Sequence, residues 1–236
     1  MSFHNSITGT LESGIVELTK PLNGQFPRPW MTNLANPSQA KVFVVGKNQA
    51  KGYSINLVGG HSRYIDALFN RNGQSCRALY DEITGGKSSP TRENIDRLTN
   101  KLAEAGVHEL LETNVICYST GMSSDLSKLI HKGGRQRGDE IFRFLLAVIR
   151  PSILIAHGAS TRVHLAKLFG RKMPPLPVGP SAVTKEQIQT FDYDLIVYPL
   201  PSLAPPAFNS WKQWSGEYQT KLAADVTNEL VLTMTK

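Results

Sequence analysis

The sequence predicts an α/β fold of three layers (α/β/α), in which helices cover both faces of a central, mostly parallel sheet of four strands. Three observations predict this class. Compact apolar runs rich in β-branched residues occur four times, and helix-like stretches separate them. The chain has 236 residues, which is enough to bury a full core without disulfides or metals. This alternation favours parallel pairing, because each helix returns the chain to the starting end of the sheet.

The predicted strands are short segments bounded by glycine, proline or polar residues. The first, "KVFVV" at 41–45, is followed by Gly46 and a loop. The other three are "LLETNVICYST" at 110–120, "SILIAHG" at 152–158 and "YDLIVYP" at 193–199. Their apolar runs are those of strands covered on both faces.

Helices are predicted between these strands from caps, stops and apolar periodicity. The clearest begins at the cap Ser89 and stops at Gly106. Its apolar residues Ile95, Leu98 and Leu102 share one face. Further helices are predicted near 63–69, 76–83, 139–150, 159–170 and 217–234, and the basic stretch "HKGGRQRG" at 131–138 is predicted to be a loop.

We expect a single domain over residues 1–236. Residues 1–40 are rich in Pro, Asn and Ser and show no sustained period, so we expect an irregular arm that wraps the domain. The core would cover 41–211, and 212–236 would form a C-terminal helical segment.

Composition is that of an ordinary globular protein, with 40% apolar and 19% charged residues. No run approaches the roughly 20 apolar residues that span a bilayer, and the N-terminus has no secretory signature. We therefore expect an intracellular monomer with no membrane contact, cytoplasmic in a bacterium and nuclear in a eukaryote. The formal net charge of +7 favours polyanionic partners, although by itself this is a weak signal.

The two cysteines, Cys76 and Cys117, lack metal-ligand spacing. We expect reduced, buried thiols, since free cysteine is among the most buried residue types. No metal site and no cofactor are predicted.

The ends of the four predicted strands carry the unusual residues, and ligands of such sheets bind at the carboxyl ends of the strands. The stretches are "VVGKNQAKGY", "TNVICYSTG", "LIAHGAST" and "YPLPSLAPPAFNSW". In this order and spacing they resemble the uracil-DNA glycosylase superfamily, above all its single-strand-selective monofunctional and mismatch-specific branches. The family motif Gly-x-Asn-Pro-Gly resembles residues 46–50, and His-Pro-Ser-Pro-Arg-Asn-Pro-x-Ala-Asn resembles residues 200–209. The resemblance runs from about Lys41 to Trp211.

The resemblance implies a catalytic motif at Gly46 and Asn48, in which the Asn48 amide oxygen orients the attacking water. An amide cannot take up a proton, so water activation would be modest. Asn114 would read the base, because a fixed carboxamide offers a donor to uracil O4 and an acceptor to N3–H, whereas cytosine presents the reverse pattern. Two alternatives stay open: Asn48 as an ordinary loop residue, and Asn114 as a structural residue bonded to nearby backbone.

The proline-rich loop would press on the DNA backbone and enter the space left by a flipped base, a task for which prolines fix the backbone in advance. Leu203 and Phe208 are the predicted wedge residues, and Ser202 would bond a phosphate. The alternative is a proline-rich turn packed on the sheet. The full set of predicted DNA contacts is Pro201, Ser202, Leu203, Phe208, Asn209, Lys47, Arg135 and Arg137, with Lys51 and Lys132 as further cations.

Two positions depart from the family pattern. Leu200 stands where the family has the histidine that stabilises the leaving base, a loss that can cost about 10²–10³ in rate. Gln49 replaces the proline after Asn48, so that loop could differ in shape. His61 or His157 could supply the missing donor, although an ordinary structural histidine is the commoner case. Tyr53 is the first choice for stacking on the base and Tyr64 the reserve.

These expectations amount to a monofunctional DNA glycosylase that removes uracil or a related damaged pyrimidine in base-excision repair, with DNA as partner. An alternative is a weakly active or inactive relative that binds damaged or single-stranded nucleic acid, which Leu200 and Gln49 favour. A third is an enzyme acting on a small phosphorylated or nucleoside ligand. Against the third, the chain has no Walker loop, no GxGxxG after a strand and no GxSxG elbow.

Overall fold

The computed structural model describes residues 2–190 and 192–234, and of these the side chains of residues 2–8 and 234 are not described. The fold is α/β, with a mostly parallel five-stranded sheet in the order β4-β2-β5-β7-β6 and a two-stranded sheet of β1 and β3. The strands are β1 Gln25–Phe26, β2 Val42–Asn48, β3 Tyr53–Ser54, β4 Leu110–Ile116, β5 Ile153–His157, β6 Glu186–Thr190 and β7 Tyr193–Leu200. The α-helices are α1 Ser2–Leu18, α2 Ile55–Val58, α3 His61–Leu68, α4 Cys76–Thr84, α5 Pro90–Glu104, α6 Gly134–Ile149, α7 Ala159–Leu168 and α8 Lys212–Met234.

The large sheet has one strand more than predicted. β5 pairs in parallel with β2 and β7, whereas the added strand, β6, pairs antiparallel with β7. β6 has the sequence "EQIQT", with only Ile188 buried. An edge strand of this kind lacks the apolar run that identifies a central strand, and for that reason its pattern was missed.

Contacts divide the chain into two compact units. The first unit comprises residues 1–40, 46–87 and 111–150, and the second comprises 41–45, 88–110 and 151–236. The units interleave along the chain. One boundary between them falls at residue 40, whereas residue 211 lies inside the second unit.

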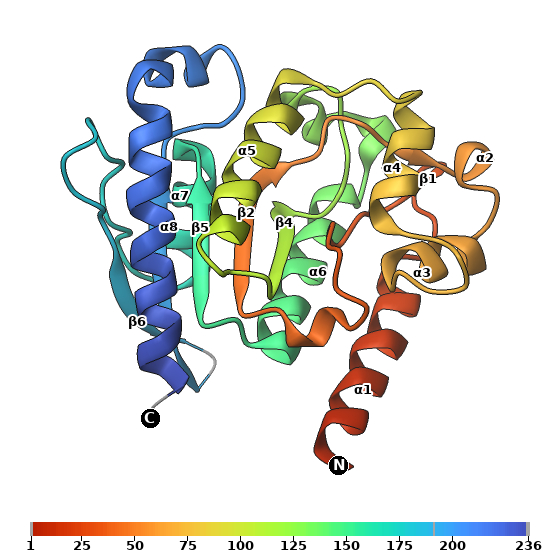
Figure 1. Cartoon of the computed structure of the whole chain (residues 1–236). Coiled ribbons are helices and arrows are strands. Elements are labelled where there is room, and N and C mark those ends of the chain that lie inside the picture. The colour runs from red at the N-terminus through yellow and green to blue at the C-terminus, as the bar shows by residue number, and fades with distance from the viewer. Residues whose placement is uncertain (1, 191, 235–236) are drawn as a thin grey trace. The chain divides into compact units, whose positions relative to one another are not determined.

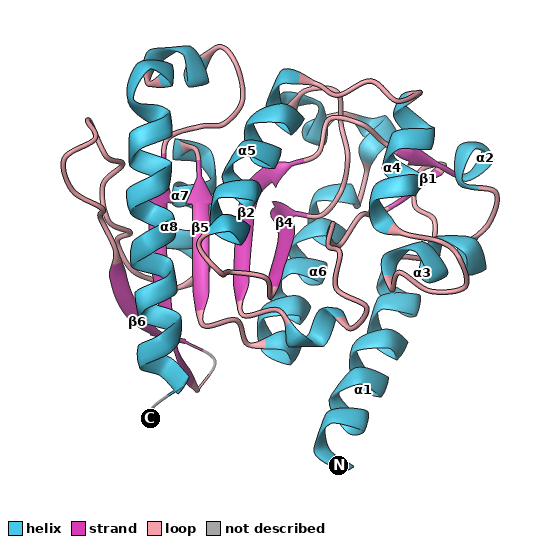
Figure 2. Cartoon of the chain, viewed as in Figure 1, coloured by secondary structure: helices cyan, strands magenta, loops and turns pink. Residues whose placement is uncertain are grey.

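The second unit is layered. Every second residue of β2, β5 and β7 faces α5 and α8 and forms a core cluster with them. This cluster includes Val44, Ile155 and Tyr198 of the strands and Leu98 and Leu222 of the helices. Alternate strand residues point to the opposite face, which α7 covers. Figures 1 and 2 show α5 and α8 in front of these strands and α7 behind them.

Helix α5 confirms the prediction made from its caps and periodicity. Ser89 Oγ accepts a hydrogen bond from the backbone N–H of Arg92, and Pro90 occupies the first turn. Leu98 and Leu102 are fully buried, and Ile95 packs partly against the same cluster. The chain leaves the helix at Gly106, whose φ of +91° lies in the region that favours glycine.

The first unit has a helix where an irregular arm was predicted. Residues 2–18 form α1, which packs on α6 through the fully buried Leu11 and Ile15. The two helices touch closely at Gly14, where a Cβ would collide with the ring of Phe144. The sequence of α1 is rich in Ser, Thr and Gly, which have weak helix propensity, so tertiary packing decides its conformation.

The predicted basic loop at 131–138 is also wrong over most of its length. Helix α6 already begins at Gly134, after the short 3₁₀ turn η3 Leu129–His131. The glycines are used for close packing instead, since a Cβ on Gly138 would lie 2.8 Å from the backbone nitrogen of Cys117.

The C-terminal helix confirms its prediction and extends it by five residues toward the N-terminus, because α8 begins at Lys212. Residues 235–236 of the predicted segment lie outside the described residues. The predicted helices at 63–69, 76–83 and 159–170 correspond to α3, α4 and α7.

Candidate functional site

Asn48 is the last residue of β2, and hydroxyl groups hold its carboxamide at both ends. Its Nδ2 donates to Thr120 Oγ1 at 2.9 Å, and its Oδ1 accepts from Ser123 Oγ at 2.7 Å. Thr120 Oγ1 in turn donates to the carbonyl of Met122 at 2.8 Å, so it receives the Asn48 amide as an acceptor. The carboxamide therefore has one orientation, and its oxygen keeps a second lone pair. Asn48 is half-buried, and the predicted catalytic Gly46 is a buried residue within β2.

Gln49 follows Asn48 and is 96% buried. Its Nε2 donates to the carbonyl of Arg28 at 2.9 Å, and its own carbonyl accepts from the N–H of Thr120 at 3.0 Å. These two hydrogen bonds thus hold the backbone directly after Asn48 in place.

Three buried polar atoms near this loop have no hydrogen-bond partner among the described residues: Gln25 Oε1, Gln49 Oε1 and Ser119 Oγ. The orientations of the two carboxamides are set, because Gln25 Nε2 donates to the carbonyl of Ser119 at 3.1 Å and Gln49 Nε2 to that of Arg28. A Cβ on Gly52 would lie 2.9 Å from Gln25 Oε1 and 3.9 Å from the Ser119 Cβ. Buried polar atoms are nearly always hydrogen-bonded, so this group is suited to a polar ligand or water.

Sequence reasoning missed Gln25, Ser119, Thr120 and Ser123. They are single polar residues at distant positions, and no motif or spacing relates them to Asn48. The only signal was the stretch "CYSTG" after the predicted second strand, whose serine and threonine prove to contact the Asn48 loop.

Asn114 lies in the middle of β4 and is half-buried. Its backbone carbonyl accepts a hydrogen bond from Cys117 Sγ at 3.1 Å. Its carboxamide makes no hydrogen bond to any described residue. The geometry therefore does not support the alternative of a structural asparagine bonded to nearby backbone. Asn48 and Asn114 both belong to the first unit.

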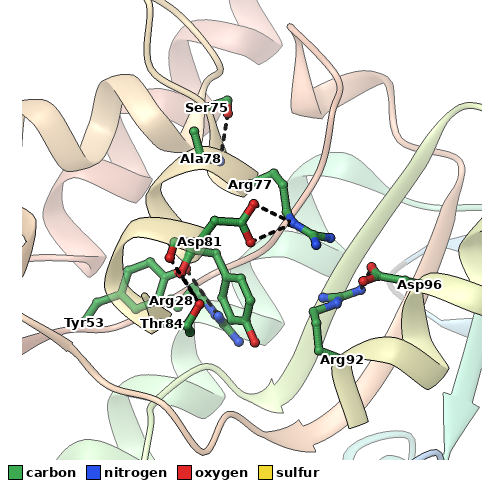
Figure 3. Close-up of polar contacts among 10 residues, drawn as sticks. Arg28, Tyr53, Ser75, Arg77, Ala78, Asp81, Thr84, Arg92 and Asp96 are labelled. Atoms are coloured by element: carbon green, nitrogen blue, oxygen red, sulfur yellow. Dashed lines mark hydrogen bonds and ion pairs between the residues drawn. The ribbon is translucent and has the colours of Figure 1, made fainter. Parts of the chain in front are cut away.

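The prediction that Tyr53 or Tyr64 stacks on a base is wrong, because both rings belong to the core of the first unit. Tyr64 is fully buried, and its hydroxyl donates to the carbonyl of Pro27 at 2.8 Å. Tyr53 is 2% exposed and packs edge-on against Tyr64. The Arg28 guanidinium lies over the Tyr53 ring, 5.1 Å from its centroid, and Nη1 donates to the Tyr53 hydroxyl at 3.3 Å (Figure 3). Burial raises the pKa of both phenols.

His61, a predicted donor, begins helix α3 and has structural partners. Its Nε2 lies 3.0 Å from Thr19 Oγ1, and its ring stacks on Phe26 with centroids 5.5 Å apart. Burial and the nearby Lys20 lower its pKa. The geometry therefore does not favour His61 as the predicted donor to a base, since its ring contacts Thr19, directly after α1, and Phe26.

His157 has a position suited to chemistry, at the carboxyl end of β5 in the second unit. In the sheet register it is paired with Leu200. Burial of the ring, with a smaller contribution from Arg92, lowers the pKa of His157 to about 4. Arg92 is itself 94% buried and forms an ion pair with Asp96 at 2.9 Å, drawn in Figure 3. The imidazole is therefore neutral at neutral pH and can donate from one ring nitrogen.

The prediction that apolar residues of the proline-rich loop act as a wedge is wrong. Leu203 is fully buried and Phe208 is 5% exposed, and both belong to the core cluster of the second unit. Trp211 closes the loop, because its Nε1 donates to the carbonyl of Ser202 at 2.8 Å. The carbonyl of Leu203 also accepts from Asn94 Nδ2 at 2.9 Å. Neither apolar side chain is free to enter DNA, because each fills the space under its own loop.

The outer surface of this loop is made by Pro205, Pro206, Ala207 and Asn209, all exposed, and the Pro205–Pro206 bond is cis. Pro201 and Ser202 are half-buried. Ser202 Oγ accepts from the N–H of Ala204 at 3.1 Å, which is a turn-forming bond. Leu200 is fully buried, so this position supplies no polar group.

The predicted phosphate-binding cations differ in their freedom. Arg135 on α6 is exposed, as are Lys51 and Lys132, and Lys47 is half-buried near the end of β2. Arg137 is used inside the first unit, where it donates to the carbonyl of Leu18 at 3.3 Å and pairs with Glu140 at 3.4 Å. Its prediction as a DNA contact is therefore not favoured by the geometry.

Both thiols confirm the prediction of free, buried cysteines. Burial raises the pKa of Cys76 to about 12 and that of Cys117 to about 11. Within residues 2–190 and 192–234, no group of three or more His, Cys, Asp or Glu is placed to hold a metal ion. In the same residues, no helix combines the length and apolar character needed to cross a bilayer.

A scan against protein-family models finds no match to this chain, and a search of curated proteins finds none either.

Proposed function

We propose that this protein is a monofunctional DNA glycosylase that hydrolyses the bond between deoxyribose and uracil or a related damaged pyrimidine. Water attacks C1′ while the C1′–N1 bond breaks, and the electron pair of that bond leaves with the base. Positive charge develops on the sugar and negative charge on the base, so a useful site orients water and donates hydrogen bonds to the base.

The observation that carries the proposal is the fixed carboxamide of Asn48. Its Nδ2 is bound to Thr120 Oγ1, and its Oδ1 accepts from Ser123 while retaining a lone pair that can accept from water. Preorganisation of this kind lowers the cost of placing the nucleophile. The unpartnered Gln25, Gln49 and Ser119 atoms near the same loop add further polar groups that a base edge or water can satisfy.

His157 supports the second requirement, a donor for the leaving base. A neutral imidazole donates a hydrogen bond to developing negative charge without bringing a cation into the site. Within the second unit it is paired in the sheet register with Leu200, where the resemblance would have a histidine, and its chemistry matches that donor role.

The test is excision of uracil from a labelled oligonucleotide, single-stranded or duplex, followed by alkaline cleavage of abasic sites. Asn48→Ala should lower the single-turnover rate roughly a hundredfold, since it removes the group that positions water. Thr120→Val keeps Asn48 but removes the acceptor for its Nδ2, and a drop of roughly tenfold is expected. Asn100→Ala, an exposed asparagine on α5, is the matched control.

A second function has one observation in its favour. Leu200 is fully buried and apolar, which is compatible with a relative that binds damaged or single-stranded nucleic acid with little or no catalysis. Binding of the uracil oligonucleotide without strand breaks, unchanged in Asn48→Ala, would establish this reading and reject the glycosylase.

A further inference from the structure

The second unit carries a surface hollow of about 410 Å³ on α7 and the segment that follows it. Four of its seven lining residues are cationic, and the remaining three are apolar. They are Arg162, Lys167, Arg171 and Lys172, with Val163, Ala166 and Met173. The volume lies in the range of pockets that hold a small ligand of nucleotide size.

Positive charge at this hollow is largely uncompensated. From Pro151 to Lys185 the chain contains five Lys and Arg and no Asp or Glu. Arg171 pairs with Glu186 at 2.6 Å, and Lys185 pairs with Asp225 and Glu229 on α8. Within the part of the chain that the structure describes, no acidic side chain pairs with Arg162, Lys167 or Lys172.

Arg162 shapes the hollow. Its Nη1 donates to the carbonyls of Met173 at 3.0 Å and Pro174 at 3.4 Å, so it holds the returning segment against α7. Lys167 and Lys172 are exposed and make no hydrogen bond to described residues. The two lysines are therefore the groups available to a ligand, and Arg162 is a positioning residue.

The hollow lies along the helix that follows the strand carrying His157, and its two lysines lie at or beyond the end of that helix farther from His157. Helix α7 starts at Ala159, two residues beyond His157, and the eight residues to Lys167 correspond to about 12 Å of helix. Gly158, between them, packs on Ser202 of the proline-rich loop, since a Cβ there would lie 3.7 Å from the Ser202 Cβ.

We propose that this hollow binds the phosphate backbone of single-stranded DNA. Lys167 and Lys172 contact phosphates, and Val163, Ala166 and Met173 provide an apolar floor for a sugar. No aromatic ring lines the hollow, so the contact does not depend on base stacking and is independent of sequence. The choice of DNA as the polyanion rests on the proposed function.

The experiment measures the affinity of the full chain for a fluorescein-labelled oligothymidylate by anisotropy at about 50 and about 200 mM KCl. This strand contains no uracil, so the readout does not depend on excision. Each phosphate contact on a single strand contributes about 0.7 to the slope of log affinity against log salt. In Lys167→Gln/Lys172→Gln the magnitude of this slope should therefore fall by about 1.4. The fold-loss of affinity between the two salt concentrations should then be roughly sevenfold smaller than in the unaltered protein.

Lys87→Gln/Lys221→Gln is the matched control, because both lysines are exposed, lie outside the hollow, and carry the same total charge. Its slope should equal that of the unaltered protein. Lys167→Arg/Lys172→Arg keeps the charge and should retain binding. An unchanged slope in the Gln pair at the hollow, or an equal loss in the control pair, would overturn the proposal.

Inorganic phosphate at matched ionic strength should not displace the oligonucleotide. Displacement would mean that the hollow binds an isolated phosphate group, and the assignment to a strand would then be wrong. The uracil excision assay is run separately on the same proteins. If the protein excises no uracil but its salt slope depends on the two lysines, the glycosylase proposal is rejected and the DNA-binding role of the hollow stands. If it excises uracil and the slope does not depend on the lysines, the glycosylase proposal stands and the role of the hollow is rejected.

Discussion

The loop after β2 and the loop after β7 both follow a buried strand, but different forces hold them. After β2, amide and hydroxyl groups of Asn48, Thr120 and Ser123 bond to one another. After β7, Leu203 and Phe208 are packed into the core. Polar anchoring fixes the orientation of a functional group and contributes little net stability, whereas apolar anchoring stabilises the fold and leaves no apolar side chain free. Substitutions in the first loop should therefore change chemistry, and those in the second should change stability.

The largest effect that separates the two loops is expected from Leu203→Ala. Truncation of a fully buried leucine leaves a cavity and should cost about 2–5 kcal/mol in the free energy of unfolding. Urea denaturation followed by circular dichroism measures it. Ala207→Ser, on the exposed side of the same loop, should change stability by less than about 0.5 kcal/mol. A stable Leu203→Ala protein with lost DNA affinity would mean that Leu203 is a wedge after all.

A smaller effect is expected from the pH dependence of stability at His157. Its pKa is about 4 in the folded protein and 6.5 in the reference state, so below pH 6.5 the unfolded chain binds the proton first. This contribution to stability is complete above pH 6.5 and is lost progressively as pH falls toward 4. The melting temperature of His157→Gln should therefore fall less between pH 6.5 and pH 4 than that of the unaltered protein.

The exposed His108 provides the control for this measurement, because His108→Gln changes the same residue type outside the sheet. If His157→Gln and the unaltered protein melt in parallel from pH 6.5 to 4, the imidazole is not held neutral by the fold. The donor role that we assign to it would then lose its basis.

The smallest effect is expected from Ser202→Ala. Its hydroxyl accepts from the N–H of Ala204, so its loss should cost about 1 kcal/mol of stability. Affinity for the oligothymidylate should stay unchanged, since the hydroxyl is committed to the turn. Thermal melting and anisotropy are the two measurements, with Ser210→Ala as the control in the same loop. A clear loss of affinity at unchanged stability would restore the phosphate contact predicted for Ser202.

Local signals predicted most of the regular structure. The cap at Ser89, the stop at Gly106 and the shared face of Leu98 and Leu102 each act within one helix, so the sequence alone is sufficient for them. Helix α1 and strand β6 were missed for the complementary reason. Their residues have weak intrinsic preference, and contacts with distant segments supply the stabilisation.

The candidate residues were predicted in part. Asn48 and His157 lie at the ends of β2 and β5, where the order of the motifs placed them. Tyr53, Tyr64, Leu203 and Phe208 were misjudged, because an aromatic or apolar residue in a loop looks the same in sequence whether it faces solvent or fills the core.

By itself the sequence determined the α/β class, the strands β2, β4, β5 and β7, the cap of α5 and the residue types at the strand ends. Tertiary structure alone decided which of those residues stay accessible, which hydroxyls orient Asn48, and where cations collect beside an apolar floor on α7. The physical reason is range. Caps and periodicity depend on neighbours within a few residues, whereas burial and hydrogen-bond partners depend on segments that are far apart in the chain and meet only when it folds.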